Sequence, residues 1–101
     1  MATTSNVLFY RGAASLTNIT LYTNPKGKRA AITHIAVTNT AGTAATFSIF
    51  LGGVAFISGA SIPANSVGLF DINQVINAET SISGSASAVT VNFHISGTTV
   101  V

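Results

Sequence analysis

Short apolar alternations separated by turn-forming residues constrain the fold of this chain more than any other sequence feature. In the clearest case, residues 88–95, Val89, Val91 and the apolar positions after them alternate with Thr and other polar side chains. Alternation over four to eight residues is typical of a half-buried β-strand. No segment of ten or more residues favours a helix. The chain is therefore expected to be all-β.

The same pattern indicates further strands along the chain. They are expected over residues 7–11, 17–23, 28–39, 46–51, 54–58, 67–72 and 80–85. Residues 73–78 are expected to form a single helical turn between two of them. Gly52-Gly53 is the signal for a two-residue hairpin turn, and Pro63, which cannot donate to a ladder, indicates a corner.

The segment 28–39 departs from a strict period of two. Its residues Ile32, Ile35 and Val37 do not all fall on one face of an ideal strand. Its many β-branched side chains favour extended structure over helix. We expect a buried central strand with a bulge near Thr33-His34.

Seven to nine short strands fit one domain of this length, since domains centre on roughly 100 to 150 residues. The sequence predicts a single antiparallel β-sandwich of jelly-roll or immunoglobulin-like type over residues 7–101. Residues 1–6 are small and polar, and they are expected to form a flexible N-terminal arm.

The 101 residues contain very few charges. The acids are Asp71 and Glu79, and the bases are Arg11, Lys26, Lys28 and Arg29. A domain with so little charge repulsion is suited to permanent association with other proteins. The net charge of +2 rests on too few groups to form a nucleic-acid surface. The cluster at Lys26, Lys28 and Arg29 is expected to be a solvated turn.

The sequence gives no sign of export or of a membrane segment. It has no cysteine, and hence no disulfide framework or thiolate metal site. The apolar run Val7 to Tyr10 is too short for a signal-peptide core. The longest apolar stretch, residues 46–60, is broken by glycine and serine and falls short of a bilayer span. We expect a protein that is made in the cytoplasm and not secreted.

The side chains that carry chemistry do not form a recognisable active site. Asp71, expected at a strand end, and Glu79, expected in a polar turn, are the only pair of carboxylates. His34 and His94 lie in expected strands without other ligands at metal-binding spacing, so a site shared with Asp71 is a remote alternative. The sequence predicts a non-enzymatic protein without a cofactor or metal.

Carbohydrate binding is an alternative because β-sandwiches often serve that purpose. Tyr10, Tyr22 or Phe50 could offer a stacking platform for a sugar ring. The absence of tryptophan and the scarcity of acids argue against this role.

Several segments of the chain carry a recognisable family pattern. They are Leu21-Tyr22-Thr23-Asn24-Pro25 followed by Gly27-Lys28; Ile32, Ile35, Val37 and Asn39; Ile62-Pro63-Ala64-Asn65-Ser66; Val75-Ile76-Asn77-Ala78; and Val91 through Ser96-Gly97. On these residues, from Thr20 to Gly97, the chain resembles the small β-sandwich virion structural proteins of tailed bacteriophages. The family pattern has Gly-Asp where this chain has Ala78-Glu79, so the turn before Thr80 is expected to differ.

The resemblance implies a capsid decoration (cement) protein that packs on the major capsid protein and stabilises the shell. By analogy it implies a trimer, and a neck, tail or fibre component is the alternative. Such proteins often add a strand to a partner's sheet. The segment Val7, Leu8, Phe9, Tyr10 and Arg11 is our candidate for that contact, and the alternative is that it is simply the first strand of its own domain.

Overall fold

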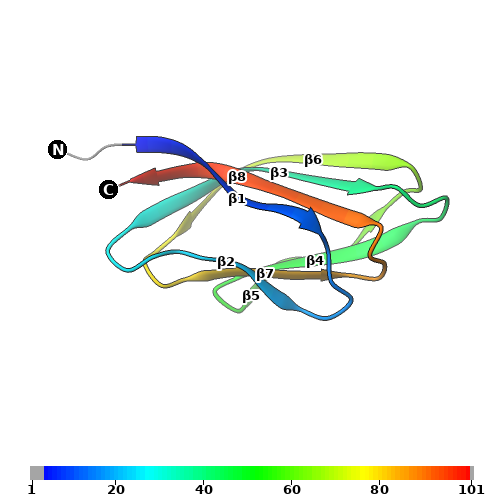
Figure 1. Ribbon diagram of the computed structural model, residues 1–101, viewed down its shortest axis with the longest axis horizontal. Coiled ribbons are helices and arrows are strands. Elements are labelled where there is room, and N and C mark those ends of the chain that lie inside the picture. The colour runs from blue at the N-terminus through cyan, green and yellow to red at the C-terminus, as the bar shows by residue number, and fades with distance from the viewer. Residues whose placement is uncertain (1–3, 101) are drawn as a thin grey trace.

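Two β-sheets lie face to face in the computed structural model, which describes residues 4–100 (Figure 1). The strands are β1 (Thr4–Ala13), β2 (Ile19–Thr23), β3 (Arg29–Asn39), β4 (Ala45–Leu51), β5 (Val54–Ile62), β6 (Ser66–Ile76), β7 (Ser81–Ala86) and β8 (Val91–Val100). Among these residues the structure contains no helix that could cross a membrane. The predicted all-β class is confirmed.

The strand order identifies the type of sandwich. One sheet has the order β1-β8-β3-β6 and the other β2-β7-β4-β5, and every pairing is antiparallel. This is the double-sheet arrangement of an eight-stranded jelly roll. Of the two sandwich types left open by the sequence, the topology selects this one.

The central strand β3 has the bulge expected from its sequence. Its register against both β6 and β8 shifts between Ile32 and His34. Thr33 is the extra residue of this bulge. It allows Ile32 before it and Ile35 and Val37 after it to face the core. These three side chains are completely buried, so the irregular spacing of the apolar residues reflects the bulge.

The two glycines of the predicted hairpin connect β4 to β5. Gly52 and Gly53 have φ angles of 60° and 81°, in the left-handed region that side chains with a Cβ disfavour. Positive φ at both central positions is the requirement of the hairpin turn that matches strand twist. The hairpin prediction is confirmed.

The helical turn expected over residues 73–78 is wrong. Strand β6 continues to Ile76, and its residues Gln74, Val75 and Ile76 pair with β3. Exposure alternates along the whole strand, with Asp71 and other odd-numbered side chains facing solvent. Pairing with the long central strand therefore decides the conformation of a segment whose local pattern is weak.

Val89 also departs from the expectation. It was grouped with Val91, Phe93 and Ile95 on the buried face of one strand. Strand β8 begins only at Val91, whose backbone N–H donates to the carbonyl of Ala88 in the preceding turn. Val89 lies in that turn and is 60% exposed.

Strand β1 starts earlier than the predicted residue 7. Thr4 pairs with Val100, and the pairing with β8 continues to Ala13. Residues 1–3 of the expected N-terminal arm, residues 1–6, lie outside the described part of the chain. The arm itself stays a prediction.

Two buried asparagines tie loops to the sandwich at the two ends of β3. The Nδ2 group of Asn24 donates to the carbonyl oxygens of Lys28, Asn77 and Ile76 at 2.9, 3.1 and 3.3 Å. That of Asn39 donates to the carbonyls of Thr43, Pro63 and Ile62 at 2.8, 3.3 and 3.4 Å. Buried amides that satisfy several carbonyls fix the loops around them.

Candidate interaction surface

The solvent-facing side of the β1-β8-β3-β6 sheet, called the outer face below, gathers several of the side chains singled out in the sequence. Its members are Asn6, Leu8, Arg11 and Ala13 on β1, Asn92, His94, Ser96 and Thr98 on β8, Arg29, Ala31, His34, Ala36 and Thr38 on β3, and Val67, Leu69, Asp71, Asn73 and Val75 on β6. Successive side chains of a strand point to opposite faces of the sheet, so these residues face solvent while the residues between them fill the core.

Four ionisable side chains form a band across the outer face, one from each strand. His34 Nδ1 lies 3.0 Å from Asp71 Oδ1, and Arg11 Nε donates to His94 Nδ1 at 3.2 Å. In the register, His94 lies opposite Ala36, two residues from His34. The two histidines are thus diagonal neighbours, with backbone positions roughly 7–8 Å apart. The ionisable band runs in the order Asp71, His34, His94, Arg11.

The His34–Asp71 contact is on the surface. The side chain of Asp71 is 94% exposed and that of His34 is 39% exposed. Contacts between such exposed groups contribute little to folding stability, because water screens them. The folded state gains little from this pairing, so the groups are available to a molecule that covers the face.

The structure corrects the expected position of Asp71. It does not end a strand but lies in the middle of β6, opposite His34 in the register. Glu79 does lie in a turn, as expected, with a φ of 64°. Within residues 4–100, no three His, Cys, Asp or Glu side chains lie close enough together to hold a metal ion.

The sequence missed the pairing of His34 with Asp71, which are 37 positions apart. The only signal for it was that both residues lie in segments predicted as strands. Which strands are neighbours, and in what register, is decided by long-range pairing.

Large apolar side chains are exposed at both edges of the outer face. Val67, Leu69 and Val75 on β6 and Leu8 on β1 are between 50% and 65% exposed. The two central strands, β8 and β3, carry small or polar side chains such as Ala36 and the two histidines of the ionisable band. Half of the large apolar side chains that are exposed among residues 4–100 lie on this face, and exposed apolar patches mark sites of protein contact.

The predicted partner-binding segment divides between the core and the surface. Phe9 is buried, and its ring centroid lies 4.7 Å from that of Tyr22. Val7 and Tyr10 pack partly against the core, whereas Leu8 and Arg11 face solvent. A register shift between Leu8 and Tyr10 turns both aromatic rings of β1 inward.

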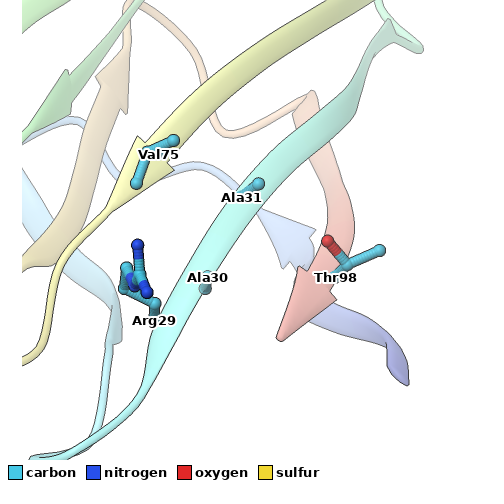
Figure 2. A pocket seen from close by; sticks show the side chains of 5 residues that line it. All are labelled: Arg29, Ala30, Ala31, Val75 and Thr98. Carbon is cyan, nitrogen blue, oxygen red and sulfur yellow. The ribbon is translucent and has the colours of Figure 1, made fainter. Parts of the chain in front are cut away.

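A small hollow lies where the outer face meets the start of β3 (Figure 2). It has a volume of about 220 Å³ and is lined by Arg29, Ala30, Ala31, Val75 and Thr98. Ligand pockets usually enclose about 300–1,000 Å³ and contain several convergent polar groups. The hollow is smaller than this range, and the guanidinium group of Arg29 is the one charged group in its lining. We therefore interpret it as a depression in the outer face and not as a site for a small molecule.

The aromatic residues considered for sugar stacking do not form an open platform. Tyr10 and Tyr22 are packed against the core, and the hydroxyl of Tyr10 donates to the carbonyl of Ala13 at 2.9 Å. Phe50 lies on β4 in the other sheet and is partly buried.

Comparisons with known proteins identify the fold. No protein-family model matches the sequence, and no curated protein does. In structure, the chain is similar to a chain of the T13 viral particle of infectious bursal disease virus (IBDV), with a TM-score of 0.59 and 10% identity. The match covers 98% of this chain and 30% of that chain. The chain thus spans about a third of the viral-particle chain.

Two further structures are similar at lower scores. The VP2 subviral particle of infectious bursal disease virus has a TM-score of 0.49 at 17% identity, over 98% of this chain and 32% of that chain. A CBM35 from Paenibacillus barcinonensis has a TM-score of 0.39 at 13% identity, over 99% and 91%. At these identities the similarity concerns the fold. Of the three structures described, the viral-particle chain alone has a TM-score above 0.5.

Proposed function

We propose that this chain is a non-enzymatic structural protein of a virion that functions by packing against other virion subunits. The observation that carries the proposal is the outer face, which has exposed apolar edges and only three formal charges, Arg11, Asp71 and, at the start of β3, Arg29. Such a surface is suited to burial against protein, because few charges must be desolvated.

The fold supports the same role. Jelly rolls of this double-sheet type are used in viral capsid domains, among other proteins. The similarity to a chain of a viral particle concerns this fold. Function does not follow from fold alone, so the proposed virion role depends mainly on the outer face.

The finer assignment is a capsid decoration (cement) protein of a tailed bacteriophage, bound to the major capsid protein. It comes from the sequence resemblance, as does the implied trimer. A neck, tail or fibre position in the same particle is the alternative.

Strand β1 is our candidate for the contact with the capsid protein. It stands at the end of its sheet, so one of its backbone edges has no neighbouring strand among residues 4–100. A partner strand can pair along such an edge by backbone hydrogen bonds. Since Phe9 fills the chain's own core, deleting the segment would unfold the domain, and the contact has to be tested in the intact chain.

Purified virions of the phage that encodes the chain provide the test. Peptide mass spectrometry should detect the chain, and single-particle imaging should locate it. A copy number close to that of the major capsid protein is expected for a decoration protein, and a far lower one for a neck, tail or fibre component. Absence from washed particles would refute the virion role, and binding to a glycan array instead would support the carbohydrate alternative.

Amide hydrogen exchange tests the β1 contact. We expect the amides of residues 7–11 to exchange more slowly when the chain is bound to particles than when it is free. The amides of the Gly52-Gly53 hairpin serve as an internal control. Equal exchange of residues 7–11 in both states would exclude the edge of β1.

A further inference from the structure

We propose that two copies of this chain pack outer face against outer face, about a two-fold axis that crosses the ionisable band between His34 and His94. The proposal deepens the assembly role above, on which it rests, by naming the occupant of this face as a second copy of the chain.

The positions of the two charged ends of the ionisable band indicate this geometry. Asp71 lies on β6 and Arg11 on β1, at opposite edges of the sheet. Three strand spacings of about 4.8 Å separate these edges by roughly 14 Å, so the two groups cannot pair within one copy. Arg11 has no carboxylate within ion-pair distance among residues 4–100.

A two-fold axis in the interface exchanges the two ends of the band. In such an interface, residue i contacts residue j and residue j contacts residue i. Asp71 of each copy then lies opposite Arg11 of the other, which gives two ion pairs. An ionisable band with opposite charges at its two ends is complementary to itself.

The middle of the band fits the same arrangement. The axis places His34 of one copy opposite His94 of the other. His94 accepts a hydrogen bond at Nδ1 from Arg11, so its neutral ring carries the proton on Nε2. Neutral imidazoles have one donor and one acceptor each, and they can meet without bringing like charges together.

The apolar edges are covered by the same operation. Strand β6 of one copy lies over β1 of the other, so the exposed Val67, Leu69 and Val75 approach the exposed Leu8. Small side chains such as Ala36 and Ser96 in the centre allow the sheets a close approach.

The area of the face is sufficient. Four strands about 4.8 Å apart and about ten residues long give a flat area of roughly 600 Å². Side-chain relief increases the accessible area towards the roughly 800 Å² per partner of a standard interface.

Sedimentation velocity of the purified chain, from about 10 μM to about 1 mM, tests the proposal. We expect a reversible dimer. Asp71→Arg and Arg11→Asp should each raise the dimer Kd at least about tenfold, because each places like charges opposite one another twice. The double variant carrying both substitutions should restore the Kd to within about threefold, because it re-forms both pairs in the reverse sense.

Two control variants match these changes in charge. Lys28→Glu changes the net charge as Arg11→Asp does, and Glu79→Lys as Asp71→Arg does. Both control residues lie in turns outside the outer face. They should leave the Kd unchanged, and circular dichroism should show that every variant is folded.

Three results would overturn the two-fold pair. They are a monomer at all concentrations, an assembly indifferent to both single reversals, and single reversals that the double variant fails to rescue. A trimer whose Kd neither single charge reversal changes would likewise overturn the two-fold pair. If the chain is a monomer but is found in virions, the two-fold pair is refuted and the virion role stands. If the double variant restores the dimer but the chain is absent from virions, the pair stands and the virion role is refuted.

Discussion

Asn24 Nδ2 lies 2.9 Å from the carbonyl oxygen of Lys28 and thereby joins the end of β2 to the residue that precedes β3. The same amide donates to the carbonyls of Ile76 and Asn77 at the end of β6, which belongs to the other sheet together with β3. One fully buried side chain therefore links two connections between the sheets.

Replacing this amide should be costly. Asn24→Leu leaves buried carbonyl groups without a donor, and we expect a loss of about 3 kcal/mol in the free energy of unfolding. Urea denaturation followed by circular dichroism measures it. Asn73→Ala, at an exposed position of β6, is the control and should change stability by less than about 0.5 kcal/mol. Equal effects of the two substitutions would contradict the role of Asn24.

Gly97 should not tolerate a side chain. A Cβ at this position of β8 would overlap the backbone carbonyl of Ala31 and press against the ring of Phe9. Backbone on the neighbouring strand cannot rotate away, so Gly97→Ala should destabilise the fold by about 2–3 kcal/mol.

Gly42→Ala is the matched control for this substitution. A Cβ at Gly42 meets no atom within 4 Å, and its φ lies outside the left-handed region. Thermal unfolding should show a clearly lower Tm for Gly97→Ala alone. A Tm unchanged in both variants would mean that β8 does not lie against β3 as described.

Glu79 has a φ of 64°, which is unfavourable for a residue with a Cβ. Glu79→Gly should raise the free energy of unfolding by about 0.5–1 kcal/mol, since relief of this strain exceeds the added freedom of the unfolded chain. Glu79→Ala removes the carboxylate but keeps the Cβ, and it should bring no gain. If both variants are equally stable, the backbone at this turn is not strained.

Much of the fold follows from local sequence. The alternation in residues 46–51 gives β4 with Phe47 and Ile49 buried, as expected, and Gly52-Gly53 makes the hairpin. The broken period in β3 indicated its bulge. These features depend on side-chain direction and backbone freedom within a few residues, which the sequence specifies directly.

The candidate site followed from the sequence only in part. The sequence grouped His34 and His94 with Asp71 only as a remote alternative of a metal site, and it singled out Arg11 as part of the segment 7–11. Their arrangement as one band depends on β3 lying between β6 and β8, with β1 beyond β8. Asp71 was misplaced because β6 was expected to end at residue 72.

The sequence by itself determined an all-β sandwich with little charge, because strand periodicity and composition are local properties. Only the tertiary structure decided the jelly-roll order, the full length of β6 and the joining of four distant ionisable groups on one face. Strand pairing brings together residues that are far apart in the chain. A shift of one residue in register would turn every side chain of a strand to the opposite face.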